Sequence, residues 1–101
     1  MIEYIREKLG TEELLAQLAE EATELAHAAL KLRRVFGGTN PTPTTYEEAI
    51  DNLEEEIADV KLLLHVLDLN NVHRKARYTN IMQIKIRRWA KRLGMPELED
   101  E

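Results

Sequence analysis

The sequence contains no cysteine, so it can form neither a disulfide framework nor a zinc site with thiolate ligands. Aromatic residues make up only 5% of the chain, and four glycines and three prolines are its only residues of those types. No long uninterrupted apolar run is present, and the first ten residues, MIEYIREKLG, carry charges throughout. We therefore expect no signal peptide and no membrane span, and we expect a cytoplasmic protein.

An excess of positive charge is also missing. The chain has 19 acidic and 14 basic residues, for a formal net charge of −5. This is the wrong sign for general attraction to a phosphate backbone, so a nucleic-acid partner is not expected. A length of 101 residues, with 44% hydrophobic and 33% charged residues, suits one soluble domain and is too short for two. We expect a single domain over residues 1–101, with a flexible acidic tail at 95–101.

Apolar residues recur at alternating steps of three and four in three long stretches, which is the period of helices that bury one side. Residues 2–9 are expected to form a short fourth helix, and the segment 37–45, GGTNPTPTT, a loop. The stripes are Leu18, Ala22, Leu25, Ala29, Leu32 and Phe36; then Tyr46, Ile50, Leu53, Ile57, Val60, Leu64 and Leu67; then Val72, Ala76, Thr79, Ile86, Ala90 and Leu93. No alternating strand pattern competes with them.

The ends of these helices carry the residues that usually begin and end helices. Thr11 precedes the first stretch, and Thr45 begins a capping box before the second. Asn71 is an expected N-cap of the third, which Gly94 ends. We predict an all-α fold, an antiparallel bundle of three long helices plus the short N-terminal one. Because the segment VKLLLHVL is apolar around most of its circumference, we expect oligomerisation, as a homodimer or homotetramer, to complete the bundle.

Four carboxylates lie beside the apolar stripes at matching spacings. Glu21 and Glu24 are three residues apart on the first helix, and Glu56 and Asp59 are three apart on the second. If these helices pack antiparallel, all four side chains can point into one gap. Anions that converge there stay ionised only if cations neutralise them. Hard oxygen ligands favour Mg²⁺ or Mn²⁺, and Mg²⁺ also binds phosphate oxygens, so a nucleotide is the expected further ligand.

A second interpretation treats these acids as a solvated surface. The chain would then be a non-catalytic helical oligomer that acts as a protein-interaction module. One such pair alone favours this structural interpretation, and two pairs with the same spacing leave the two interpretations evenly matched. Among other residues, Trp89 and Phe36 are expected in the core and His27 at the surface.

The third helix has the opposite charge to the second. Between residues 71 and 94 the sequence has eight lysines and arginines and no acid, whereas residues 45–69 hold eight acids and one lysine. Opposite charges on two helices can hold the helices together, and the basic side chains can also donate hydrogen bonds to phosphate groups. Lys85, Arg88 and Arg92 share one flank of this helix. A nucleic-acid reader built on this helix is the least favoured interpretation.

The acidic residues also form two known motifs. Glu20, Glu21 and Glu24 give Glu-Glu-x-x-Glu, and Glu56 with Asp59 gives Glu-x-x-Asp on the next helix. In this order, and with the later basic segment IKIRRWAKRL, they resemble the MazG-like all-α nucleoside triphosphate pyrophosphohydrolases, particularly small phage-type members. The likeness covers about residues 11–93.

The resemblance implies a Mg²⁺-dependent enzyme that cleaves a ribo- or deoxyribonucleoside triphosphate to the monophosphate and pyrophosphate. It implies dimers or higher oligomers as well. The residue roles that it implies are metal ligation by Glu21, Glu24, Glu56 and Asp59, a nearby Glu20 that is a ligand or orients a water, and phosphate binding by Lys85 and Arg88. For the chemistry of a metal-bound water, the catalytic candidates that could accept its proton are Glu20 and Glu24.

Overall fold

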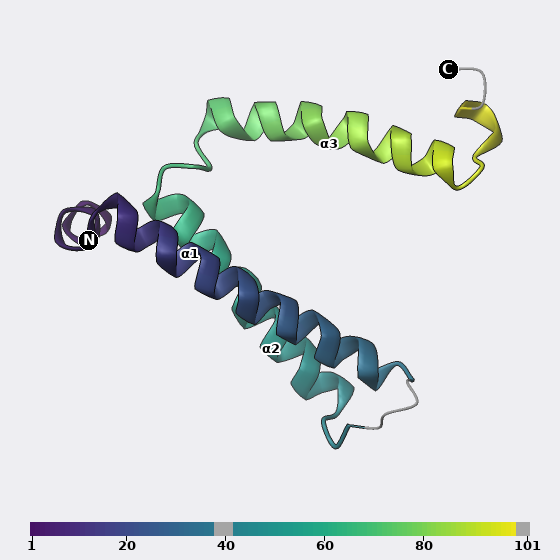
Figure 1. Ribbon diagram of the computed structural model, residues 1–101, viewed down its shortest axis with the longest axis horizontal. Coiled ribbons are helices and arrows are strands. Elements are labelled where there is room, and N and C mark those ends of the chain that lie inside the picture. Colours follow the sequence, from purple (N-terminus) through teal and green to yellow (C-terminus); the bar gives the residue numbers. More distant parts are fainter. Residues whose placement is uncertain (38–41, 99–101) are drawn as a thin grey trace. The chain divides into compact units, whose positions relative to one another are not determined.

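The structure, a computed structural model, describes residues 1–37 and 42–98, which form helices and no strand. In order, the elements are α1 (Ile2–Val35), α2 (Tyr46–Val66), α3 (Val72–Arg92) and a short 3₁₀ helix, η1 (Pro96–Leu98) (Figure 1). The predicted all-α class with three long helices is confirmed. Within the described ranges, no helix is long and apolar enough to cross a membrane.

The chain divides into two compact units, Met1–Leu69 and Asn70–Glu101. The first unit is the α1–α2 hairpin and the second contains α3 and η1. The expectation of one domain therefore stays a prediction. Residues 38–41 of the predicted loop and residues 99–101 of the predicted tail lie outside the described residues.

Side chains cap the beginnings of α2 and α3 as the sequence indicates. The Thr45 hydroxyl accepts a hydrogen bond from the Glu48 backbone N–H at 3.2 Å and donates to the Glu48 carboxylate at 3.2 Å. Asn71 Oδ1 accepts from the Arg74 N–H at 2.9 Å. Gly94, with φ of 87°, follows the end of α3 in a conformation that favours glycine. Each cap satisfies a backbone group that the helix leaves unpaired, which sets these boundaries.

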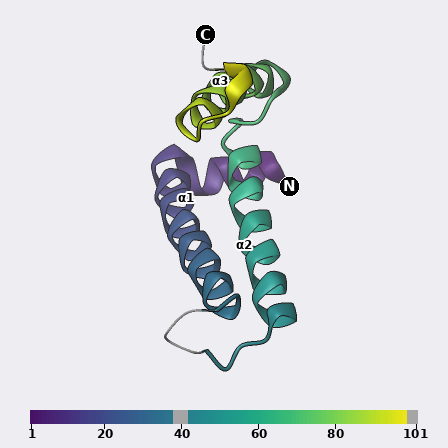
Figure 2. The same cartoon turned by 90° about the vertical axis from the view of Figure 1, so that its right-hand side faces the viewer.

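α1 is broken at Gly10, whose φ of 77° and ψ of 164° are not helical. The predicted short N-terminal helix is therefore a separate segment, and Figure 2 shows the first turns of α1 running across the end of the hairpin. Arg6 in this segment donates through Nε to the Val66 carbonyl and through Nη2 to the His65 carbonyl, the latter at 3.3 Å. A guanidinium at the C-terminal end of α2 also interacts favourably with the helix dipole.

α1 and α2 run antiparallel and side by side, as both views show (Figures 1 and 2). The centre of their contact near the N-terminal break is the buried cluster of Leu14, Leu63 and Val66. Further along, Ala28 on α1 and Ala49 on α2 are buried, and small side chains of this kind permit close packing of helices. Partly buried residues that pack around the cluster are Ile2, Leu18 and Leu67.

The side of α2 that faces α1 differs from the predicted stripe. Ile57, at the middle of that stripe, is 37% exposed, whereas Ala49, Leu63 and Val66 are buried. At about 100° per residue, the buried side of α2 centres within about 30° of Glu56 and not on Ile57. The prediction was wrong here because α2 is apolar around most of its circumference. Periodicity alone could not identify which of its apolar sides contacts α1.

The predictions for Phe36 and Trp89 were also wrong, since these side chains are 73% and 60% exposed. Phe36 follows the last turn of α1 and packs edge-to-face on Tyr46 at the start of α2, with ring centroids 5.6 Å apart. This contact links the end of α1 to the start of α2, at the end of the hairpin that is opposite the Gly10 break. In the second unit, Leu98 of η1 is buried, so the chain just after α3 is structured.

We predict that Gly10→Ala lowers the free energy of unfolding by about 1–3 kcal/mol, because a φ of 77° with extended ψ is accessible almost only to glycine. A Cβ at this position meets no atom within 4 Å, so the loss of stability would come from backbone strain and not from a steric clash. Urea unfolding followed by circular dichroism measures it. D-alanine at position 10, introduced by chemical synthesis, is the matched control and should be tolerated. If L-alanine and D-alanine at position 10 lowered the free energy of unfolding equally, backbone strain would not be the cause.

Candidate metal centre

Three of the predicted carboxylates meet between α1 and α2. Glu21 comes from α1, and Glu56 and Asp59 come from α2. One oxygen from each lies within 4.8 Å of the others, and all three residues are half-buried. The structure therefore brings Glu21 together with two residues that lie 35 and 38 positions later in the sequence, as the antiparallel hairpin predicts.

The positions of these residues follow from the hairpin's geometry. Glu56 is near the centre of the side of α2 that faces α1, and Asp59 is one turn later on the flank of that side. Glu21 lies between the half-buried residues Leu18 and Leu25 on α1. The cluster therefore occupies a place in the helix contact that an apolar side chain would otherwise fill.

Glu56 is the residue with the most unusual environment. Its Oε2 atom is buried and has no hydrogen-bond partner among the described residues. Burial raises the pKa of Glu56 above the usual value, and the negative charges of Asp59 and Glu21 raise it further. A buried carboxylate oxygen without a donor is rare in folded proteins, because it loses its hydration without a replacement. This atom is the observation that most favours a cation at the cluster.

Glu24 lies near the cluster without being part of it. Its side chain is exposed, but its charge contributes to raising the pKa of Glu56. Glu20 is also exposed and is not one of the clustered residues. The roles of Glu20 and Glu24 in metal binding or catalysis stay predictions.

Glu55 was missed by the sequence analysis. It is exposed, and its charge also raises the pKa of Glu56. The run Glu54-Glu55-Glu56 was visible in the sequence, but only the side of α2 that faces α1 shows which of these acids borders the cluster. Five carboxylates therefore contribute to the negative potential in this part of the hairpin, namely Glu21, Glu24, Glu55, Glu56 and Asp59.

The three clustered residues fit a divalent cation. They offer carboxylate oxygens, the ligand type that Mg²⁺ and Mn²⁺ prefer. An ion at about 2.1 Å from each oxygen can bridge atoms up to about 4.2 Å apart, so only small side-chain rotations separate the present arrangement from a shared ligand set. A bound cation would also neutralise the repulsion that raises the pKa of Glu56.

The predicted phosphate-binding residues lie in the second unit. Lys85 and Arg88 are both exposed on α3, three residues apart. Arg88 lines a shallow hollow with Ile84, Arg87 and Lys91. The hollow is strongly cationic, which suits an anionic group. Phosphate binding by Lys85 and Arg88 stays a prediction.

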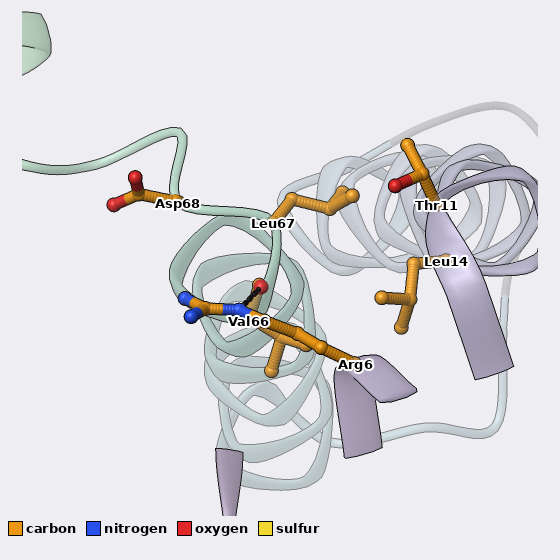
Figure 3. Close-up of a pocket in the computed structure, with 6 residues that line it drawn as sticks. All are labelled: Arg6, Thr11, Leu14, Val66, Leu67 and Asp68. Atoms are coloured by element: carbon orange, nitrogen blue, oxygen red, sulfur yellow. Dashed lines mark hydrogen bonds between the residues drawn. The ribbon is translucent and has the colours of Figure 1, made fainter. Parts of the chain in front are cut away.

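A different hollow lies at the end of the hairpin, lined by Arg6, Thr11, Leu14, Val66, Leu67 and Asp68 (Figure 3). Its volume of about 260 Å³ is below the range of about 300–1,000 Å³ that is usual for ligand sites. Arg6, its only basic residue, already binds backbone carbonyls of α2. Val66 is also ten residues beyond Glu56, or about 15 Å along the helix. We therefore do not assign a substrate to this hollow.

Comparison with known proteins identifies a family. The family model described as MazG nucleotide pyrophosphohydrolase domain matches residues 9–92, which include the candidate metal-binding, catalytic and phosphate-binding residues. No curated protein and no solved structure gave a match to the chain.

We predict that Glu56→Gln raises the melting temperature of the protein in a chelator, because the substitution removes a charge that the helix contact holds unfavourably. The same substitution should remove most of the stabilisation by Mg²⁺. In the unsubstituted chain we expect a rise of roughly 5–10 °C at about ten times the dissociation constant of Mg²⁺. Differential scanning calorimetry measures both effects. Glu54→Gln, at an exposed position of the same helix, is the control and should keep the response to Mg²⁺. If Glu56→Gln lowered the melting temperature in chelator and left its rise with Mg²⁺ intact, Glu56 would not be a ligand of the ion.

Proposed function

This chain belongs to the MazG nucleotide pyrophosphohydrolase family, and we propose that it cleaves nucleoside triphosphates, ribo or deoxy, between the α and β phosphates. The products are a nucleoside monophosphate and pyrophosphate. We further propose Mg²⁺ as the cofactor, with Mn²⁺ as a substitute. The observation that carries the proposal is the convergence of Glu21, Glu56 and Asp59, with one buried Glu56 oxygen that has no partner.

Glu21, Glu56 and Asp59 would hold the cation, and Glu24 is the fourth candidate ligand. Glu24 lies one turn after Glu21 on α1, and its exposed side chain is free to rotate toward the cluster. When bound, the ion would supply positive charge to phosphate oxygens and lower the pKa of a coordinated water. The carboxylates themselves would fix the position of the charged groups, which is the main requirement of phosphoryl chemistry.

Glu20 and Glu24 are the proposed proton acceptors. A general base has to reach the water that attacks the phosphate, either directly or through one more water. Both residues lie on the exposed side of the cluster, where substrate and water can enter. Glu56 is less suited to this role, because its unpartnered oxygen is buried between the helices.

Lys85 and Arg88 are the proposed phosphate-binding residues. Their spacing of three places both on one side of α3. A guanidinium can bind two phosphate oxygens at once, whereas an ammonium group acts as a single charge. The two residues would therefore hold the triphosphate by different contacts.

We predict that Asp59→Asn lowers kcat/KM for nucleoside triphosphates by roughly 100-fold or more, because it weakens the binding of an ion that contributes several kcal/mol to the reaction. Pyrophosphate release from a panel of ribo- and deoxyribonucleoside triphosphates measures the activity. Asp51→Asn, at an exposed acid on the same helix, should retain activity, and a chelator should abolish activity in every variant.

Two results would contradict this proposal. If the chain binds Mg²⁺ but releases no pyrophosphate from any nucleotide, it is not a pyrophosphohydrolase. If neither stability nor activity responds to Mg²⁺, the acids are a solvated surface, and the interaction-module interpretation is the better one.

We predict that Lys85→Ala and Arg88→Ala each raise KM by about 10-fold or more, since each removes a charge-assisted hydrogen bond worth about 1.5–3 kcal/mol. The stabilisation by Mg²⁺ should be unchanged in both, because neither residue holds the ion. Arg74→Ala is the control near the other end of α3 and should have a normal KM. An unchanged KM in Lys85→Ala and Arg88→Ala would remove these residues from the site.

A further inference from the structure

Two uncharged polar side chains lie in the contact between α1 and α2 beside the acidic cluster. Within residues 11–35 and 46–66, five polar residues are half-buried, namely Glu21, Glu56 and Asp59 of the cluster, together with Gln17 and Asn52. The structure gives neither carboxamide a side-chain hydrogen bond to the residues that it describes. A polar group that is partly dehydrated without a partner is unfavourable, so packing of the hairpin does not account for Gln17 and Asn52.

The register of the hairpin places Gln17 at one end of the cluster. Leu14 clusters with Leu63, and the acidic cluster begins seven residues further along α1 and seven residues back along α2. Gln17 lies four residues before Glu21, or about 6 Å along the helix. It is therefore level with residues 60–63 of α2, toward the end of the hairpin where α1 is broken.

Asn52 lies at the opposite end of the cluster. It precedes Glu56 by four residues, or about 6 Å, and α2 runs antiparallel to α1 (Figures 1 and 2). It is therefore level with residues 25–28 of α1, toward the end of the hairpin where Phe36 contacts Tyr46. The two carboxamides thus border the cluster at both ends along the length of the hairpin.

Both carboxamides lie on the same side of the hairpin as Glu24 and Asp59. At about 100° per residue, Gln17 and Glu24 are rotated by about 40° and 60°, in the same sense, from the clustered glutamate of α1. On α2, Asn52 and Asp59 are rotated by about the same angles from the clustered glutamate of that helix. Because the helices are antiparallel, equal rotations point to one common side, which we call the acidic side.

The two ends of the acidic side differ in character. Leu62 is one turn after Asp59 and level with Gln17, and its side chain is 54% exposed. Beyond Asn52, the acidic side carries the exposed residue Lys31 of α1. One end therefore offers an apolar surface beside a carboxamide, and the other end offers a carboxamide followed by a cation.

Acidic residues further out do not create this difference. Glu13 and Glu48 lie on the acidic side, one near each end, and both are exposed. The Glu48 carboxylate accepts a hydrogen bond from the Thr45 hydroxyl as part of the cap of α2. The ends are therefore distinguished by Leu62 and Lys31.

A nucleoside triphosphate has a matching asymmetry. Its phosphates carry negative charge and only acceptor oxygens, which suit a lysine and the N–H groups of a neutral carboxamide. Its base has a flat face, which an apolar side chain can cover, and an edge with both donors and acceptors. A glutamine offers one acceptor oxygen and two N–H donors, so it can form a pair of hydrogen bonds with a base edge.

We propose that the nucleotide lies along the acidic side, with its base at Gln17 and Leu62 and its terminal phosphates toward Asn52 and Lys31. Gln17 is then the residue that selects the base, and Asn52 binds phosphate whatever the base is. The inference rests on the proposed function, because an ion in the cluster has to hold the triphosphate between the two ends.

Substitutions at position 17 test base selection. In the unsubstituted chain we expect kcat/KM to vary by about 10-fold or more among triphosphates of the five common bases, and Gln17→Leu should reduce this spread to about 3-fold or less. Gln17→Glu keeps the shape but offers only acceptors, so it should shift the preference toward cytosine and adenine, whose amino groups donate. Thr23→Leu, at an exposed position on the outer side of α1, is the control and should keep the original preference.

Inorganic tripolyphosphate, which has no base, tests the other end. Isothermal titration in the presence of Mg²⁺ measures its binding without any need for activity. Asn52→Leu and Lys31→Ala should each raise its dissociation constant by about 10-fold, since each removes a donor to an anion. Gln17→Leu should leave this constant within about 2-fold, and so should Lys61→Ala, which removes an exposed cation on the opposite side of α2.

Three results would overturn the proposal. The first is an active enzyme without base preference, or one in which Gln17→Leu lowers kcat/KM for every base by the same factor. The second is equal weakening of tripolyphosphate binding by Gln17→Leu and Asn52→Leu. The third is a base preference that changes in Asn52→Leu and not in Gln17→Leu, which would mean that the nucleotide lies in the reverse direction.

Failure of the proposed function has a different result. If the unsubstituted chain releases no pyrophosphate from any nucleotide, the enzyme proposal and this inference fail together. If it hydrolyses nucleotides with a base preference that ignores position 17, only this inference fails.

Discussion

Repulsion among carboxylates in the contact between α1 and α2 is the constraint on which the interpretation of this structure depends. One oxygen each of Glu21, Glu56 and Asp59 lies within 4.8 Å of the others, although like charges in a helix contact repel one another. The cost is greatest at Glu56, where burial and neighbouring charge both raise the pKa of the side chain. A fold keeps such an arrangement when another component compensates for it. A divalent cation is a component that these oxygens fit, and we propose that the hairpin holds one.

Much of the fold follows from the sequence. The caps at Thr45 and Asn71 and the glycines at helix ends fixed the helix boundaries, because each of these signals acts on its nearest neighbours. A separate short helix over residues 2–9 was predicted as well, although Gly10 was not identified as the residue that ends it. Which side of α2 contacts α1 was not visible, since Ile57 and Leu63 are equally apolar and only packing distinguishes them. Exposed Trp89 shows the same limit, because hydropathy does not specify which surface covers a residue.

The candidate site was predictable in part. The i, i+3 spacing of the acids and the antiparallel hairpin place Glu21, Glu56 and Asp59 together, and these are short-range geometric rules. The burial of one Glu56 oxygen and the influence of Glu55 depend on the rotation of α2 about its axis, which the sequence did not specify. The position of Lys85 and Arg88 relative to the acids depends on packing between units. It could not follow from helix periodicity.

The central claim is that Glu21, Glu56 and Asp59 share one divalent cation, and anomalous diffraction from crystals grown with Mn²⁺ tests it most directly. The account predicts one strong anomalous peak between α1 and α2. The ion at this peak should contact one oxygen of each of the three residues, so that the buried Glu56 oxygen gains a partner. The claim would be contradicted if crystals in saturating Mn²⁺ showed no anomalous peak at this place and the three carboxylates were turned outward into solvent.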